Sequence, residues 1–316
     1  MLLRNRWNQN GRHVIAVRTF NDRLTIWVKL WEIQMTMRIN QHNSSVADNQ
    51  VTQSSQFERR FGGIQRLYGE QGLLRINAAH VCVIGVGGVG SWVVEALARS
   101  AVGKITLIDM DIVAPSNVNR QLHALSSTFG RDKTAVLKER CIDINPEIQI
   151  DEIDDFVSRD NLPTMISAKF DVVVDCIDDF RTKAALIHFC KSQNIHLITV
   201  GGAGGQTDPS KIRHADLSRT QHDVLLARTR KLLRQDYGFP KNPKRSFGIA
   251  SIYSDEQLLY PDGLGGLSRQ RPARSQTKGE LSNALNCAGG LGSVTHVTAS
   301  FGFAAAALAL KRLADG

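Results

Sequence analysis

From residue 57 onward, short apolar runs alternate with stretches whose apolar residues recur at helical spacing. Residues 81–86 predict a buried strand, and residues 91–100 predict the helix that follows it. The alternation continues with strands expected at 105–109, 148–153, 171–176 and 196–200, and helices at 133–144, 158–167 and 182–193. Apolar strands that alternate with helices are typical of a parallel sheet covered on both faces. We therefore predict a doubly wound, Rossmann-like α/β fold with a mostly parallel sheet.

The regularity weakens after the glycine run at residues 201–205. A basic helix is expected at 221–237, a strand at 247–254 and an irregular loop at 258–284. Residues 289–310 carry no Lys, Arg, Asp or Glu, and their length would permit a membrane span. Glycines and hydroxyl side chains dilute the first half of this stretch. A buried helix packed on the sheet is therefore our interpretation, with membrane association as the alternative.

Residues 1–56 differ from the rest of the chain. They hold three of the four tryptophans, followed by a long polar run, and no period of 2 or 3.6 persists. We interpret them as a disordered N-terminal extension, with a small binding arm as the alternative. Met35 and Met37 are alternative starts, so whether residues 1–56 belong to the native protein stays open.

Composition narrows the class of protein. A hydrophobic content of 42% is enough for a substantial core, and 22% charged residues exclude disorder of the whole chain. The net charge of +9 suits an anionic partner. The five cysteines form no Cys-x-x-Cys pair, so we expect reduced thiols in a cytoplasmic protein and no zinc site. The apolar stretch at 14–17 is too short for a secretion signal.

A glycine-rich turn carries the first chemical signal. Gly85, Gly87, Gly88 and Gly90 follow the first expected strand and open a helix. Such glycines allow a tight turn and a close approach of backbone N–H groups to phosphate. Asp109 ends the next strand, where a carboxylate can accept hydrogen bonds from ribose hydroxyls. These residues predict a nucleotide site, and a redox dinucleotide fits them as well as ATP does.

Further polar side chains are expected past the carboxyl edge of the sheet. They are Asp111, Asn117, Arg120, Gln121, Lys133 and Asp178. Arg120 can bind phosphate through two hydrogen bonds, and Lys133 can act as a point charge. Because the glycine turn already serves a pyrophosphate, two more cations indicate a triphosphate, and Asp178 is placed to hold Mg²⁺. The alternative is that Arg120 and Lys133 only form surface ion pairs with nearby aspartates.

As a set, these motifs resemble the ATP-dependent adenylating enzymes of the ubiquitin-activation (ThiF and MoeB) type. The set comprises the glycine turn, Asp109-Met110-Asp111, the run from Ser116 to Gln121, Lys133 and Cys176-Ile177-Asp178. The resemblance implies an ATP-binding half at 57–205, with catalytic roles for Arg120, Lys133 and Asp178. The implied ATP-site residues are Gly87, Asp109, Asn117, Arg120, Gln121, Lys133 and Asp178. It also implies an arginine that crosses to the partner subunit, for which Arg60 and Arg66 are the candidates.

Within this superfamily, residues 57–316 most resemble the tRNA threonylcarbamoyladenosine dehydratases. The similarity rests on Arg60–Gly63 with Arg66–Gly69, on Gly201–Gln206 with Asp208-Pro209, and on the glycine-rich segment after Cys287. It implies a cytoplasmic homodimer that uses ATP and Mg²⁺ to cyclise a threonylcarbamoyl-modified adenosine beside the tRNA anticodon. The intermediate would be an acyl adenylate, and sulfur-transfer proteins are candidate accessory partners. Residues 206–316 would then be the substrate half.

The segment 225–250 supports a nucleic-acid partner, with a solvated helix face as the alternative. Its basic residues are Arg228, Arg230, Lys231, Arg234, Lys241, Lys244 and Arg245.

The rival functions are an activator of a ubiquitin-like or sulfur-carrier protein, an NAD-dependent oxidoreductase, and a non-catalytic nucleotide-binding scaffold. Carrier-protein activators usually bear two Cys-x-x-Cys pairs, which this chain lacks. Cys287 is expected to be a buried structural thiol, with a reactive thiol as the alternative.

Overall fold

A computed structural model describes residues 6–7, 13–14, 35, 56–242, 244–270 and 291–316. The chain divides into two units, Met1–Gly62 and Gly63–Gly316. In the first unit, strands β1 (Arg6–Trp7) and β2 (His13–Val14) pair antiparallel, and residues 56–62 are helical. Most of the expected N-terminal extension lies outside the described residues, and its disorder stays a prediction.

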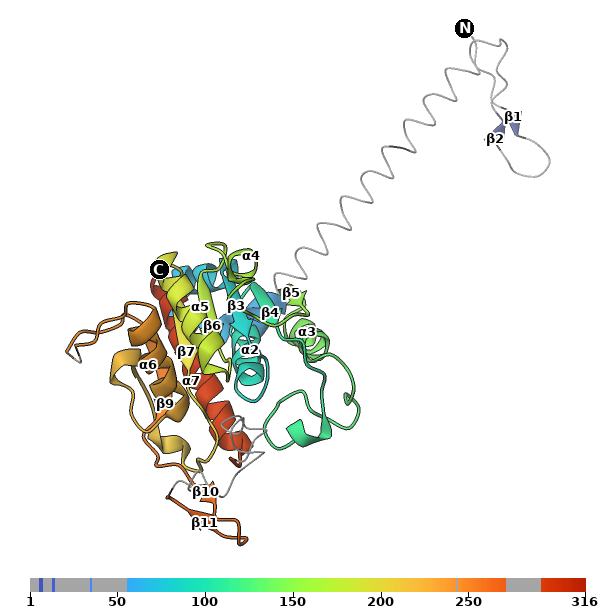
Figure 1. Cartoon of the computed structure of the whole chain (residues 1–316). Coiled ribbons are helices and arrows are strands. Elements are labelled where there is room, and N and C mark those ends of the chain that lie inside the picture. Colours follow the sequence, from blue (N-terminus) through green and yellow to red (C-terminus); the bar gives the residue numbers. More distant parts are fainter. Residues whose placement is uncertain (1–5, 8–12, 15–34, 36–55, 243, 271–290) are drawn as a thin grey trace. The chain divides into compact units, whose positions relative to one another are not determined.

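The second unit is built on a seven-stranded sheet in the order β5-β4-β3-β6-β7-β9-β8 (Figure 1). The strands are β3 (His80–Ile84), β4 (Lys104–Ile108), β5 (Gln149–Ile153), β6 (Val172–Asp175), β7 (Leu197–Val200), β8 (Ile212–Asp216) and β9 (Ala250–Ser254). All neighbours pair in parallel except β8, which lies antiparallel at one edge. The predicted doubly wound α/β fold is confirmed.

Helices cover both faces of this sheet. Successive residues of a strand point to opposite faces, so an apolar strand needs a core on each side. Val81 and Val83 of β3 lie in one hydrophobic core, whereas Cys82 and Ile84 lie in the other. The first core includes α2 and α7, and the second includes α5 and α6. The helices are α2 (Gly90–Arg99), α3 (Lys133–Ile144), α4 (Leu162–Met165), α5 (Phe180–Ser192), α6 (Val224–Asp236) and α7 (Thr295–Asp315). The long apolar strands are therefore buried on both faces.

Helix α7 corresponds to the uncharged C-terminal stretch, and it begins at Thr295. By length and composition it could cross a membrane, but 61% of its apolar window is buried within the protein. At Gly302 its backbone approaches α2 so closely that a Cβ atom would lie 2.7 Å from Trp92 Cβ and 2.8 Å from the Val89 carbonyl oxygen. The expected packed helix is thus confirmed from Thr295 onward.

Several boundaries differ from the sequence prediction. Strand β9 begins at Ala250 and not at 247, because the N–H groups of Phe247, Gly248 and Ile249 donate to the Asp216 carboxylate. A helix at 63–78 and strand β8 were not predicted. The expected helix at 158–167 is reduced to the single turn α4. Two short strands, β10 (Tyr260–Pro261) and β11 (Leu267–Ser268), pair within the region expected to be irregular.

Candidate active site

The glycine turn joins β3 to α2 and leaves room for a ligand. Gly85 has φ +79°, and a Cβ atom on Gly90 would overlap the Gly85 carbonyl oxygen. Gly87 is open, with only the Gln121 side-chain nitrogen within 4 Å of a Cβ position there. Helix α2 follows without a side-chain cap on Val89. Its first N–H groups therefore offer the donors and the positive dipole end that bind phosphate.

Asp109 ties this turn to the next strand. One residue beyond β4, its Oδ2 accepts a hydrogen bond from Val86 N at 2.7 Å and its Oδ1 accepts one from Asp111 N at 2.9 Å. Burial raises the pKa of the Asp109 carboxyl, whereas Lys133 and these N–H donors oppose that shift. The carboxylate is therefore held in one orientation at the end of the turn.

Lys133 is the first residue of α3, and its side chain is only 5% exposed. Its Nζ donates to Asp111 Oδ2 at 2.7 Å and lies 4.0 Å from Asp109 Oδ1. The ion-pair alternative considered for Lys133 is therefore found in the structure. The ammonium group nevertheless lies close to the glycine turn, because Asp109, 4.0 Å away, binds Val86 of that turn directly.

Arg120 lies against the glycine turn, with its Cγ and Cδ 3.3 Å from the position of a Cβ on Gly88. Its Nη1 donates to the Ser116 carbonyl oxygen at 2.8 Å and to Asn119 Oδ1 at 3.0 Å. Within the described residues it forms no salt bridge, so the ion-pair alternative is wrong for Arg120. Its charge remains available to an anion.

Asn117 and Gln121 belong to the same loop as Arg120 and are both buried. Asn117 is buried and its Oδ1 accepts from Ala114 N at 3.0 Å, which closes the turn before Arg120. Gln121 is 6% exposed, and its Oε1 has no hydrogen-bond partner within the described structure. A buried amide oxygen without a partner is costly unless a ligand or water meets it. Gln121 thus fits a ligand-facing role beside Gly87.

Asp178 lies past the carboxyl end of its strand. Strand β6 ends at Asp175, and Asp178 lies in the loop before α5. Its carboxylate is exposed and takes part in no hydrogen bond or ion pair in the described part of the chain. The side chain is therefore free to meet a hydrated cation.

Beneath that loop lies a buried charged network that sequence reasoning missed. Lys183 and Asp175 are both fully buried, and the Lys183 Nζ donates to Asp175 Oδ2 at 2.8 Å. Thr199 Oγ1 donates to the same oxygen at 2.7 Å, and Asp175 Oδ1 accepts from Ile177 N at 3.0 Å. The network fixes the backbone that leads to Asp178. Its sequence signal was only a lysine inside an otherwise apolar helix face.

His123 was also missed. It is 2% exposed, and neither ring nitrogen has a partner among the described residues. Burial, aided by the charge of Lys133, lowers its pKa to about 4, so the imidazole is neutral at physiological pH. Its proximity to Arg120 and Gln121 in sequence was the available signal.

The structure says less about the remaining candidates, Arg60, Arg66 and Cys287. Arg60 and Arg66 are exposed helical residues, Arg60 in the first unit and Arg66 in the second. The crossing of either one to a partner subunit stays a prediction. Cys287 lies outside the described residues, whereas Cys82, Cys141, Cys176 and Cys190 are free thiols. No group of three or more potential metal-binding His, Cys, Asp or Glu side chains occurs in the part of the chain that the structure describes.

The arrangement matches a known family. The sequence profile of the ThiF family matches residues 60–315. The chain belongs to the ThiF family. A relative from Haemophilus influenzae, named tRNA threonylcarbamoyladenosine dehydratase, is 49% identical over 257 residues, which cover 81% of this chain and 94% of the relative. The Escherichia coli protein of that name is 45% identical over 263 residues, covering 83% and 96%.

The ThiF-family likeness extends to three dimensions. The solved structure of E. coli tRNA N6-threonylcarbamoyladenosine dehydratase in complex with ATP has a TM-score of 0.71 and 44% sequence identity. The match covers 81% of this chain and 94% of that structure. The stretch from Gly85 to Asp178, which contains the glycine turn and the charged edge, lies inside the region matched by the family profile.

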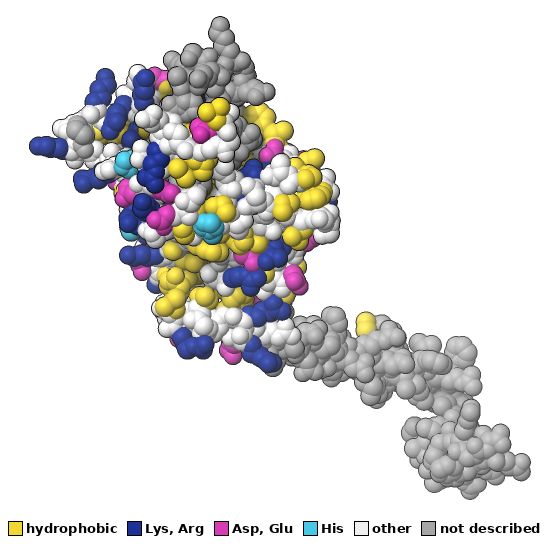
Figure 2. All heavy atoms as spheres, turned by 90° about the horizontal axis from the view of Figure 1, so that it is seen from below, with side chains coloured by type: hydrophobic (Ala, Val, Ile, Leu, Met, Phe, Trp, Pro, Cys, Tyr) yellow, Lys and Arg dark blue, Asp and Glu magenta, His cyan; other side chains and the backbone are white. Residues whose placement is uncertain are grey.

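A basic surface lies on and after α6. In Figure 2, many of the visible Lys and Arg side chains gather at the left, the side on which α6 lies in Figure 1. The structure divides the basic residues of segment 225–250 into two groups. The half-buried group is Arg228, Arg230 and Arg234. The Arg228 guanidinium lies 5.7 Å from the centroid of the Phe180 ring, Arg230 donates to Thr220, and Arg234 donates to the Pro240 carbonyl oxygen. The exposed cations are Lys231, Lys241, Lys244 and Arg245.

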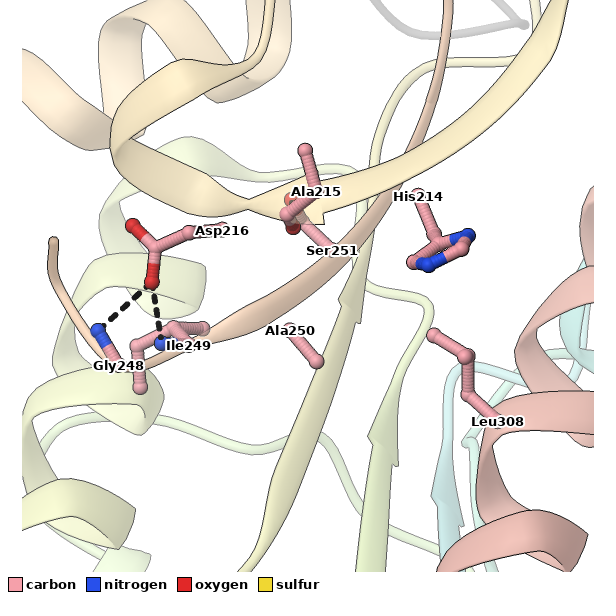
Figure 3. Close-up of a pocket in the computed structure, with 8 residues that line it drawn as sticks. All are labelled: His214, Ala215, Asp216, Gly248, Ile249, Ala250, Ser251 and Leu308. Carbon is pink, nitrogen blue, oxygen red and sulfur yellow. Dashed lines mark hydrogen bonds between the residues drawn. The ribbon is translucent and has the colours of Figure 1, made fainter.

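A separate cavity of about 370 Å³ lies at the other end of the strands (Figure 3). It is lined by His214, Asp216 and Ser251, among others, and by Leu308 of α7. Asp216 ends β8 opposite Ala250, the first residue of β9, so the cavity lies at the amino edge of the parallel strands. The polar candidates for nucleotide binding lie at the carboxyl edge, where ligands of open α/β sheets bind.

Proposed function

We propose that the chain is an ATP-dependent tRNA threonylcarbamoyladenosine dehydratase. The observation that carries the proposal is the similarity to two relatives of that name, at 49% and 45% identity over nearly their whole length. The carboxyl edge of the sheet supports it independently, because it combines a phosphate-binding turn, an arginine outside any salt bridge in the described structure and a buried lysine. This combination fits a nucleoside triphosphate better than a redox dinucleotide.

ATP would bind along this edge. The glycine turn and the start of α2 would hold phosphate, and Asp109 would accept hydrogen bonds from the ribose. The E. coli structure in complex with ATP, similar over 81% of this chain, supports ATP as the nucleotide. Arg120 and Lys133 would lie beside the phosphates, with Gln121 as a further polar contact next to Gly87. The alignment of the triphosphate would thus depend on side chains that are already fixed.

The reaction requires activation of a carboxylate, because oxide is too poor a leaving group for direct ring closure. A carboxylate oxygen of the threonylcarbamoyl group would attack the α-phosphorus of ATP, forming an acyl adenylate and releasing pyrophosphate. A nucleophile within the urea-like group would then attack the acyl carbon, expelling AMP and losing one proton. The net change is loss of one water from the modified adenosine. Arg120 and Lys133 would stabilise the charge that develops on the phosphates.

The residues present also fit Mg²⁺. This ion usually keeps several waters and takes one or two protein carboxylates together with substrate phosphates. Asp178, exposed and without a partner in the described structure, matches that demand. When bound, Mg²⁺ would neutralise phosphate charge. The role of Asp178 would be to hold the ion on a loop whose backbone is fixed by Asp175.

The tRNA would contact the basic surface of α6 and the loop after it. The exposed cations Lys231, Lys241, Lys244 and Arg245 can track phosphates without disturbing the helix. Arg230 and Arg234 already have intramolecular partners, so their contribution would be smaller. A cytoplasmic homodimer with Arg60 or Arg66 crossing between subunits, and sulfur-transfer proteins as accessory partners, complete the proposal.

The decisive experiment is turnover with defined substrates. The purified full chain would be incubated with ATP, Mg²⁺ and tRNA bearing threonylcarbamoyladenosine, and nucleosides would be analysed by mass spectrometry. We expect a product lighter by one water, with AMP and pyrophosphate formed in equal amounts. ATP–pyrophosphate exchange with a sulfur-carrier protein but not with tRNA would favour the carrier-protein activator. Hydride transfer with NAD and no ATP dependence would favour the oxidoreductase.

A further inference from the structure

The loop that carries Arg120 is fastened to a distant part of the chain. Trp92 Nε1 donates to the Arg120 carbonyl oxygen at 3.1 Å. Thr295 Oγ1, on the first residue of α7, donates to the Asn119 carbonyl oxygen at 2.6 Å. Arg120 is therefore held through its backbone by α2 and through its neighbour by α7.

Asn119 links this attachment to the guanidinium group itself. Its Oδ1 accepts from Arg120 Nη1 at 3.0 Å, while its Nδ2 donates to the Ser293 carbonyl oxygen at 2.8 Å. One amide thus contacts both the cation and the residues just before α7. Moving the start of α7 would move the guanidinium, because the two share a rigid planar group.

The same residues also hold the loop at the end of β7. Gly205 N donates to the Gly292 carbonyl oxygen at 2.8 Å, and His296 Nε2 lies 3.0 Å from the Thr207 carbonyl oxygen. We call residues Gly292–Thr298 the brace. It joins the Arg120 loop to the loop that begins at Gly201, which lies at the carboxyl edge two strands from β3.

We propose that the brace, acting through Asn119, positions Arg120 for the adenylation reaction, so that Thr295 of the brace and Asn119 of the Arg120 loop are positioning residues. This inference rests on the proposed function, since Arg120 is taken to act on the phosphates of ATP. Neither positioning residue needs to touch ATP. Their effect is to fix the guanidinium beside Gly88 before the substrate arrives, which lowers the cost of ordering it.

The test uses an isosteric pair at one position. Thr295→Val removes the hydroxyl and keeps the shape, whereas Thr295→Ser keeps the hydroxyl. We expect Thr295→Val to lower kcat/KM for ATP about 5-fold, as for the loss of one hydrogen bond, and Thr295→Ser to stay within about 2-fold of wild type. Calorimetric titration with ATP, which needs no turnover, should show weaker binding for Thr295→Val alone.

A double-mutant cycle shows whether the effect passes through Arg120. In an Arg120→Lys background, Thr295→Val should change kcat/KM by less than about 2-fold, because lysine lacks the guanidinium group that Asn119 holds. An equal loss in both backgrounds, or wild-type behaviour of Thr295→Val, would overturn the proposal. Asn119→Ala provides a second variant, and thermal unfolding checks that each one is folded. Absence of tRNA cyclisation by the wild type would instead reject the proposed function, while the ATP titrations still test the brace.

Discussion

The carboxyl edge of the sheet and the surface of α6 both present positive charge, but they are built differently. At the edge, Lys133 is buried and hydrogen-bonded to Asp111, and Arg120 is held at two acceptors. On the other surface, Lys231 and Lys241 extend into solvent. A fixed charge in a partly dry site can stabilise one transition state, whereas exposed charges attract any polyanion over a distance set by salt. The first arrangement suits phosphate chemistry and the second suits recruitment of a nucleic acid.

The largest expected effect concerns the buried network beneath the edge. Lys183→Met would leave Asp175 as an unpaired buried carboxylate and should lower the free energy of unfolding by about 3–5 kcal/mol. Lys231→Met, on the exposed surface of α6, is the matched control and should change it by less than about 0.5 kcal/mol. Urea denaturation measures both. Coincident midpoints for the two variants would contradict the contrast between the regions.

The next effect concerns catalysis without loss of the fold. Arg120→Ala and Lys133→Ala should each remove about 2–4 kcal/mol of transition-state stabilisation, since each deletes a charged donor beside the phosphates. Single-turnover rates of AMP formation measure this, with circular dichroism as the check on folding. Near-normal rates in both variants would remove the assignment of the ATP site.

A pH effect should appear where the edge meets α6. Burial raises the pKa of Asp223, the N-cap of α6, to about 6, against the N–H groups of Leu226 and Gly202 that favour its ionised form. Between about pH 4 and pH 6 the folded chain therefore keeps a proton that the unfolded chain has released. As the pH rises through this window, the free energy of unfolding should therefore fall by about 1.4 kcal/mol per pH unit relative to Asp223→Asn. Parallel pH profiles of the two proteins would show that Asp223 titrates normally.

The exposed surface should affect binding more gradually. Replacing Lys231, Lys241, Lys244 and Arg245 with glutamine should flatten the log–log salt dependence of tRNA affinity by roughly 0.7–0.9 for each phosphate that the variant no longer neutralises. ATP affinity should not change. Arg230 and Arg234 are left intact, because their internal hydrogen bonds would confound the result. Identical salt slopes for wild type and variant would mean that tRNA binds at another surface.

The smallest effect is expected from the N-terminus. Removal of residues 1–36 should leave kcat and KM within about 2-fold of the full chain, because no periodic apolar face in that segment demands a partner in a core. Steady-state kinetics with tRNA and ATP measure it. A large loss of turnover would support the binding-arm interpretation of this segment.

The contrast between the two regions also explains what sequence could predict. The β-α-β alternation placed the ends of β3, α3 and β7 within two residues, because strands buried on both faces leave long apolar runs. The edge strand β8 was missed, since its half-exposed residues carry no such run. Motif spacing located Asp109 and Lys133 at one edge. Contacts such as Asn119 with Ser293 join residues far apart in the chain, so no local pattern reveals them.

The close approach of α7 to α2 at Gly302 has a consequence for how the protein is made. The glycine turn opens α2, and the Arg120 loop is tied to the start of α7, yet Thr295 lies 176 residues after Asn119 in the chain. During translation, residues 85–133 leave the ribosome long before the helix that completes their surroundings. A nascent chain should therefore acquire full affinity for ATP only after α7 has been synthesised and packed against α2, and deletion of several turns of α7 should be more harmful than loss of the first 36 residues.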